Sequence, residues 1–287
     1  MSRIARAFAG LRRRGERALI PYFTAGDPSL EVTRALLLEA ARQGADLIEL
    51  GIPFSDPLAD GPVIQRASQR ALAAGVTLPR VLELVREVRG ELDLPLVFLT
   101  YYNPVLAFGL KAFARTAVEV GVDGVSVADL PPEEAEPLAT EARASGLDLI
   151  HLVAPTSPPE RMRLIARRSR GFIYAVSLTG VTGARAELSP DLAQYLRDLR
   201  AVTRKPICVG FGISSPEQVA ALAEYADGII VGSAIVRLIE EHRGSERLVD
   251  EVGRFIASLK ERGSGFEDRG SFELPRTPNP EPRSPNP

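Results

Sequence analysis

One pattern of hydrophobic and polar positions recurs along most of the chain: a short apolar run, a polar loop, then a longer amphipathic stretch. The apolar runs are rich in β-branched and aromatic residues, as buried strands are. The longer stretches, such as 29–44 and 78–92, repeat their apolar residues at helical spacing. Eight runs are predicted strands: Ala18–Thr24, Ala45–Gly51, Leu94–Tyr102, Asp123–Asp129, Leu147–Val153, Gly171–Ser177, Pro206–Gly212 and Asp227–Ser233.

This alternation favours one fold class. Strands that alternate with helices pair in parallel, because a helix is needed to return the chain to the start of the next strand. Eight such units in about 250 residues predict a single-domain (β/α)8 TIM barrel. A doubly wound sheet is the alternative, but its first strand normally leads into a Gly-rich dinucleotide fingerprint, and "YFTAGDPS" is not one. In a barrel, functional residues lie at the carboxyl ends of the strands.

The two ends of the chain differ in character. The N-terminus is Arg-rich like a transit peptide, yet Ile4, Phe8 and Leu11 recur at helical spacing, which favours a structural helix over part of the core. From Arg262 onward the chain is rich in Gly, Ser and Pro and can neither form a helix nor bury a core. We therefore expect a barrel domain over 1–261 and a disordered tail over 262–287.

Composition narrows the setting. A net charge of −2 gives no reason to expect nucleic acid or an anionic membrane as partner. The single cysteine, Cys208, rules out an internal disulfide and fits a reducing compartment, so we expect a cytoplasmic protein. No apolar stretch approaches the roughly 20 residues that a membrane-spanning helix requires.

A carboxylate interrupts the second predicted strand, within "IELGIPFSDPLADGPVIQ". Both faces of a barrel strand are covered, so Glu49 is expected to be buried or at the barrel mouth. It is either a structural carboxylate paired with an arginine or a general acid/base whose pKa is raised by desolvation. Asp60, in the loop after this strand, could simply shape a turn, but its position beside Glu49 favours a role in catalysis.

Glycines follow three consecutive strands, in the segments 180–183, 210–215 and 231–236. Glycine lets backbone N–H groups approach an oxyanion, and barrels often bind phosphate with the loops after strands seven and eight. Ordinary tight turns are the alternative for any one loop. Their occurrence at the strands where barrels bind phosphate makes a phosphate site the better interpretation.

Other reaction types find little support in the sequence. The two histidines, His151 and His242, belong to no cluster of metal ligands. No lysine is placed for a Schiff base: Lys205 precedes its strand, Lys111 falls in a predicted helix, and Lys260 is close to the tail. A phosphate-binding barrel of this kind would have to move protons with carboxylates. The side chains of Tyr22, Leu99, Tyr101 and Tyr174 could line a pocket for a flat apolar ligand.

Five stretches together resemble one enzyme family: "PYFTAGDPS", "ADLIELGIPFSDPLADGPVIQRA", "TGVTGAR", "GFGIS" and "ADGIIVGSAIV". They are similar to segments of the alpha subunit of tryptophan synthase, and the likeness runs from about Ala18 to Lys260. The second stretch is highly specific, whereas the glycine loops also occur in other phosphate-binding barrels. The chain departs from the family in its tail after about Gly263, and it has Tyr22 where some relatives carry Phe.

The resemblance implies a lyase of tryptophan biosynthesis that splits indole-3-glycerol phosphate into indole and glyceraldehyde 3-phosphate. It makes Glu49 and Asp60 the catalytic carboxylates. It further implies no cofactor on this chain and a separate beta subunit, which holds pyridoxal phosphate, in an alpha2-beta2 heterotetramer. The substrate would lie near Tyr22, Ile64, Leu99, Tyr101, Tyr174 and Thr182, and its phosphate near Gly183, Gly212, Gly232 and Ser233.

Two rival functions are open at this point. One is another sugar-phosphate barrel, such as an isomerase or indole-glycerol-phosphate synthase. The Glu49–Asp60 element and the scarcity of lysine argue against it. The other is a barrel that binds the same phosphate ester without turning it over and only regulates a partner, and the presence of both carboxylates argues against that.

Overall fold

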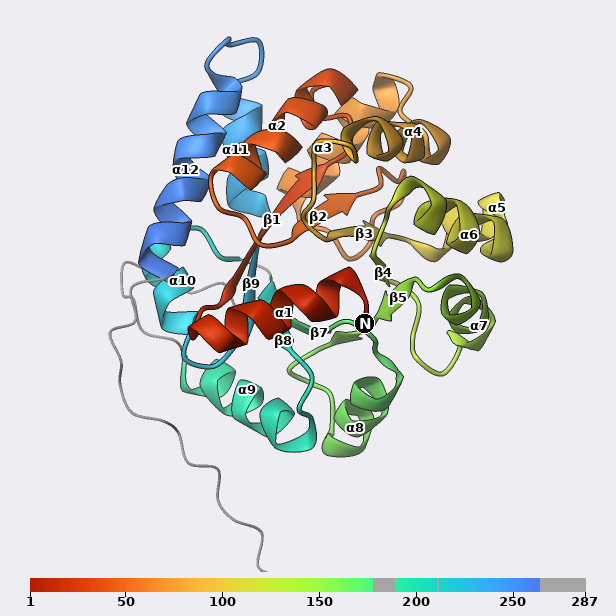
Figure 1. Cartoon of the computed structure of the whole chain (residues 1–287), viewed down its shortest axis with the longest axis vertical. Helices are drawn as coiled ribbons and strands as arrows, with labels where there is room; N and C mark the ends of the chain where they lie inside the picture. Colours follow the sequence, from red (N-terminus) through yellow and green to blue (C-terminus); the bar gives the residue numbers. More distant parts are fainter. Residues whose placement is uncertain (178–188, 211, 264–287) are drawn as a thin grey trace, which may run out of the picture.

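The computed structural model describes residues 1–177, 189–210 and 212–263, so the predicted site residues Thr182 and Gly183 lie outside it. Within these ranges nine parallel strands form one sheet in the order β5-β4-β3-β2-β1-β9-β8-β7-β6, surrounded by helices (Figure 1). The strands are β1 Ala18–Thr24, β2 Ile48–Gly51, β3 Leu96–Thr100, β4 Gly124–Val127, β5 Asp148–Ile150, β6 Leu152–Val153, β7 Ile173–Val176, β8 Ile207–Gly210 and β9 Gly228–Val231.

The outermost strands of that order, β5 and β6, are two parts of one barrel strand. Only His151 separates them. β5 pairs with β4 and β6 pairs with β7, so this segment closes the sheet on itself. Across the interruption the His151 N–H donates to Ser169 Oγ (3.0 Å), and its carbonyl accepts from the Tyr174 N–H (3.1 Å). The nine segments therefore make the eight strands of a (β/α)8 barrel, and the predicted fold class is confirmed.

The described helices surround this barrel (Figure 1). α2 packs between α12 and α4 in the outer shell, whereas α3, which follows β2, packs against α11, which follows β9, beside β1. No described helix is long and apolar enough to cross a membrane. The helices are α1 Arg3–Arg14, α2 Leu30–Arg42, α3 Pro62–Ala73, α4 Leu78–Val88, α5 Tyr102–Phe108, α6 Leu110–Val120, α7 Glu136–Ser145, α8 Pro159–Arg168, α9 Pro190–Val202, α10 Pro216–Leu222, α11 Ser233–Glu241 and α12 Leu248–Gly263.

Helix α1 covers the amino end of the barrel, crossing its near face in Figure 1. Ser2 caps the helix by accepting a hydrogen bond from the Ala5 N–H (3.3 Å). Ile4, Phe8 and Leu11 are buried in the cluster that fills the barrel interior, as their spacing predicts. A structural helix therefore occupies this segment, as its apolar spacing predicts. At the other end α12 runs to Gly263, two residues beyond the predicted domain boundary. Residues 264–287 lie outside the described ranges, and a disordered tail stays a prediction.

Two hydrophobic clusters lie on the two sides of the sheet, and the strand alternation assigns side chains to each. In and just before β2, Leu47 belongs to the interior cluster, whereas Ile48 and Leu50 belong to the cluster under the helices. Glu49 alternates with Ile48 and Leu50 and is paired in register with Tyr22 on one side and Val97 on the other. The Glu49 side chain therefore points into the barrel, at the carboxyl end of its strand.

Candidate active site

Glu49 is a buried carboxyl group that has no ionic partner among the described residues. It is 1% exposed, and its Oε2 accepts a hydrogen bond from the Tyr174 hydroxyl at 3.4 Å. Its Oε1 is buried and has no hydrogen-bond partner among the residues that the structure describes. No described arginine or lysine forms a salt bridge with it, which does not fit the interpretation of a structural carboxylate clamped by an arginine. A buried carboxyl oxygen without a partner suits a group that awaits a ligand.

Burial raises the pKa of Glu49 to about 8, because desolvation disfavours the charged form. The hydrogen bond from Tyr174 opposes this shift, and the nearby charge of Asp60 adds to it. At neutral pH Glu49 therefore carries its proton. A carboxylic acid held neutral near pH 7 can donate that proton and later take one back.

Asp60 stands in the loop after β2, which is held by Tyr101 just beyond the end of β3. The Tyr101 hydroxyl accepts from the Ala59 N–H (3.0 Å) and donates to the Asp60 carboxylate, and the Tyr101 ring stacks on Phe54 with centroids 5.2 Å apart. Burial raises the pKa of Asp60 to about 6, and the Tyr101 hydrogen bond opposes the rise. At neutral pH Asp60 is thus mostly ionised while Glu49 is protonated, so two neighbouring carboxyl groups can take different roles.

Four of the side chains predicted to line the substrate pocket lie in one part of the structure. The hydrophobic cluster that fills the barrel interior includes Tyr22 and Tyr174. Ile64 and Leu99 are partly buried and pack against this cluster. The Tyr22 hydroxyl lies 3.3 Å from Thr24 Oγ1, a buried pair of hydroxyl groups just beside Gly51. The structure thus brings these side chains to the end of the barrel where Glu49 points; that they contact a substrate stays a prediction.

Two glycines to which our sequence analysis gave no role beside the tyrosines, Gly51 and Gly210, make room for the hydroxyl groups of Tyr22 and Tyr174. A Cβ at Gly51 would lie 2.1 Å from the Tyr22 hydroxyl oxygen, and a Cβ at Gly210 would lie 2.6 Å from the Tyr174 hydroxyl oxygen. Glycine inside a strand often marks such a close approach, and this signal could have identified both positions. Gly51 and Gly210 therefore set where the two hydroxyl groups can sit.

The predicted phosphate site is partly described. Gly212 follows β8, Gly232 is the residue before α11, and Ser233 is the first residue of that helix. Because β8 and β9 pair, their following loops start side by side. Gly232 also lies against the Tyr22 ring, where a Cβ would be 3.4 Å from Cδ1. The first N–H groups of a helix have no acceptor within the helix, so the N-terminus of α11, beside Tyr22, suits an anion. Thr182 and Gly183 fall outside the described residues.

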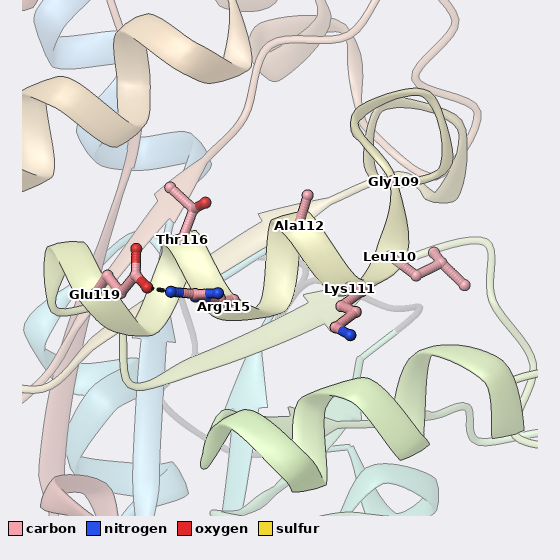
Figure 2. Close-up of a pocket in the computed structure, with 7 residues that line it drawn as sticks. All are labelled: Gly109, Leu110, Lys111, Ala112, Arg115, Thr116 and Glu119. Atoms are coloured by element: carbon pink, nitrogen blue, oxygen red, sulfur yellow. Dashed lines mark hydrogen bonds and ion pairs between the residues drawn. The ribbon is translucent and has the colours of Figure 1, made fainter.

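Other candidate chemistry lies elsewhere or is missing in the described ranges. The residues there form no group of three or more His, Cys, Asp or Glu side chains that could hold a metal ion. His151 is buried, and burial lowers its pKa to about 4, with Arg168 and Lys205 as further causes. A surface hollow on α6 is lined by side chains that point in several directions, with none from the site (Figure 2).

Together, the fold and this carboxyl pair are what is expected of one class of protein, the (β/α)8-barrel enzymes that move protons with carboxyl groups. Comparison with known proteins gives the family. The model of the family described as Tryptophan synthase alpha chain matches residues 8–263. The chain belongs to that family.

The matches to individual relatives extend over nearly the whole length of each relative. The tryptophan synthase alpha chain of Geobacter sp. (strain M21) is 51% identical over 261 residues, which is 91% of this chain and 97% of that protein. The crystal structure of tryptophan synthase subunit alpha from Legionella pneumophila is 39% identical, with a TM-score of 0.86 over 93% of this chain and 100% of that one. A chain of the tryptophan synthase a2b2 complex from Pyrococcus furiosus is 41% identical, with a TM-score of 0.80 over 85% of this chain and 98% of that one.

Proposed function

We propose that this chain catalyses the retro-aldol cleavage of indole-3-glycerol phosphate to indole and glyceraldehyde 3-phosphate, a reaction of L-tryptophan biosynthesis. One observation carries the proposal beyond family membership. Glu49 is a buried, protonated carboxyl group that faces the barrel interior with one oxygen unpartnered in the described residues, and an ionised carboxylate, Asp60, is close enough to affect its charge. A reaction in which one group first donates a proton and then accepts one requires a carboxyl group in this state.

The first step is protonation of the ring. Glu49 donates its proton to the indole carbon that carries the glycerol chain, and the positive charge that results is spread toward the ring nitrogen. Asp60, ionised at neutral pH, accepts a hydrogen bond from the indole N–H and stabilises that charge. The pKa difference between the two carboxyl groups suits this division of roles.

The second step breaks the carbon–carbon bond. Glu49, now a carboxylate, takes the proton from the hydroxyl on the side-chain carbon next to the ring. The aldehyde forms there, the bond to the ring breaks, and its electron pair returns to the ring and neutralises the positive charge. Glu49 ends protonated, as it began, so the cycle needs no outside acid or base.

Two further groups of residues would hold the substrate. The phosphate would be bound by Gly183, Gly212, Gly232 and Ser233. The rest of the substrate would contact Thr182 and the side chains named below. An anchored phosphate fixes the position of the ring, and such positioning is worth several kcal/mol when the geometry is right. Ile64 and Leu99, with Tyr22, Tyr101 and Tyr174, would bury the flat indole.

The proposed partner subunit is inferred from the relatives. The Pyrococcus furiosus protein is part of an a2b2 complex, and we propose that this chain likewise assembles with a beta subunit, which would hold the pyridoxal phosphate and use the indole. On this chain we expect no cofactor. We place the assembly in the cytoplasm, in keeping with the single buried thiol, Cys208.

The test is indole release from indole-3-glycerol phosphate by the full chain, alone and with its beta subunit. We expect slow release alone and faster release in the complex. Glu49→Gln should lower the rate by roughly 10²–10⁴-fold. Glu91→Gln, a change at an exposed glutamate paired with Arg34, is the matched control and should leave the rate unchanged. A Glu49→Gln variant with the wild-type rate would refute the mechanism, and binding without any turnover would support the regulatory rival.

A further inference from the structure

Arg70, on α3, joins two carboxylates that belong to other segments. Its Nε and Nη2 donate to both carboxylate oxygens of Asp27, at 2.8 and 2.7 Å, and its Nη1 donates to Glu240 Oε1 at 2.7 Å. The Asp27 side chain is only 1% exposed and that of Arg70 is 18% exposed. Arg66, one helical turn earlier, adds two bonds to Glu240 at 2.9 and 2.8 Å. Buried, bidentate pairs of this kind hold their partners in one geometry.

The three connected segments bear on different parts of the site. α3 begins at Pro62, directly after the loop with Asp60, and carries Ile64 on its first turn. α11 begins at Ser233, next to the predicted phosphate position Gly232, and ends just after Glu240. Asp27 lies in the loop after β1, and β1 stands between β2 and β9 in the sheet. Arg70 therefore ties the part of the site with the carboxylates to the part with the phosphate loops.

The separation of these two parts matters for a substrate that carries its reacting ring at one end and its phosphate at the other. Anchoring the phosphate helps the chemistry only if the ring then falls against Glu49 and Asp60. α3 and α11 are rigid rods of 12 and nine residues, so joining their later turns fixes the spacing of their first turns.

We propose that Arg70 is a positioning residue that holds α3 and α11 at the spacing the substrate spans, so that phosphate binding places the ring for proton transfer. The proposal rests on the proposed function. It also requires arginine at this position. A lysine ammonium cannot bond both oxygens of Asp27 and reach Glu240 in the same geometry, because it lacks the planar fork of donors.

The experiment compares turnover of the whole substrate with binding of its two halves. For Arg70→Lys in the full chain with its beta subunit, we expect kcat for indole-3-glycerol phosphate to fall at least tenfold. The inhibition constants of glycerol 3-phosphate and of indole, which report the halves separately, should stay within about twofold of the wild type. A merely structural role would lower the active fraction and the thermal midpoint without this split.

Two further variants complete the test. Arg34→Lys, at an exposed ion pair with Glu91, is the control and should change neither kcat nor the inhibition constants. Glu240→Gln removes the charge and one of the two acceptor oxygens on α11, which weakens the contact of Arg70 with that helix, and it leaves the Asp27 pair intact. It should therefore show a smaller version of the same split even if Arg70→Lys folds poorly. An unchanged kcat, or a parallel loss of glycerol 3-phosphate affinity, would overturn the proposal. Failure of the wild type to release indole would instead refute the proposed function.

Discussion

The Tyr174 hydroxyl on β7 donates to Oε2 of Glu49 on β2 across the inside of the barrel, with 3.4 Å between the two oxygens. The other Glu49 oxygen has no partner in the described part of the chain. One oxygen of the carboxyl group is thus oriented by Tyr174, and the other has the unpaired position that the proposed proton transfer requires. Because the donor is a buried neutral phenol, it can orient the group without supplying the charge that would keep it ionised.

Removing that hydrogen bond should shift the alkaline limb of the pH–rate profile. The Tyr174 hydrogen bond lowers the pKa of Glu49, so in Tyr174→Phe the pKa should rise further above about 8. Activity should persist to higher pH, with kcat at pH 7 reduced only a few-fold because orientation is lost. The measurement is kcat/KM for indole release across pH 5–10. An alkaline limb that stays in place would show that it belongs to another group.

The acid limb should belong to Asp60. The wild-type profile is expected to rise as Asp60 ionises near pH 6 and to fall as Glu49 loses its proton near pH 8. The Tyr101 hydrogen bond lowers the pKa of Asp60, so Tyr101→Phe should move the acid limb to higher pH and leave the alkaline limb in place. Asp60→Asn should abolish the acid limb along with most activity. Movement of both limbs together in Tyr101→Phe would contradict the assignment.

The sequence was sufficient for the fold and for the covered position of Glu49, because both depend on local periodicity; which face of the strand carries Glu49 came from the structure. The run at β2 showed by its alternation that Glu49 and Leu47 share a face, and the parallel strands meant that this face is covered. The interruption of one strand at His151 was not predictable, since it depends on the hydroxyl of Ser169, 18 residues away. The alternation of apolar and polar residues along a strand carries no information about a contact with a residue so far away in the chain.

Contacts between distant segments account for the rest of what was missed. Glu240 lies 170 residues from Arg70, and nothing near either residue in the chain indicates that they meet. The fit of Gly51 to the Tyr22 hydroxyl likewise depends on the register between β1 and β2. Sequence patterns identify which residues could act at a site. Which other residues they contact depends on how distant segments pack in the folded protein.

The fit between Gly51 and Tyr22 should be measurable as an energetic coupling. A Cβ at position 51 would lie 2.1 Å from the Tyr22 oxygen, so Gly51→Ala should overpack the barrel and cost roughly 1–3 kcal/mol of unfolding free energy. Tyr22→Phe removes the oxygen and should recover part of that loss in the double variant. Urea unfolding of the four proteins gives the coupling, and additive losses would show that the two positions are independent.

A substitution at the amino end of the barrel, away from the carboxyl ends of the strands, should lower the stability of the protein without changing its catalytic properties. Arg89, 13% exposed, donates to the carbonyls of Gly121, Leu92 and Leu94 and to the carboxylate of Asp123. Arg89→Met leaves these partly buried acceptors short of a partner, so it should lower the unfolding free energy on the order of 3 kcal/mol. The pH–rate profile and KM of the remaining folded protein should match the wild type. A changed KM would indicate that this end of the barrel affects the site.

Glu49 should make the folded protein less stable as the pH rises. Its pKa is raised from 4.5 to about 8 on folding, so between these values the folded state holds a proton that the unfolded state has released. Stability from this group therefore falls as the pH rises from 4.5 to about 8, after which the full cost of burying the charge is present. Glu49→Gln does not titrate and should be more stable than the wild type by a margin that grows from pH 5 to pH 8.5. Thermal midpoints across that range would measure it, with Glu91→Gln as the exposed control. A margin that does not change with pH would mean that Glu49 is ionised in the folded protein at neutral pH and cannot act as the acid.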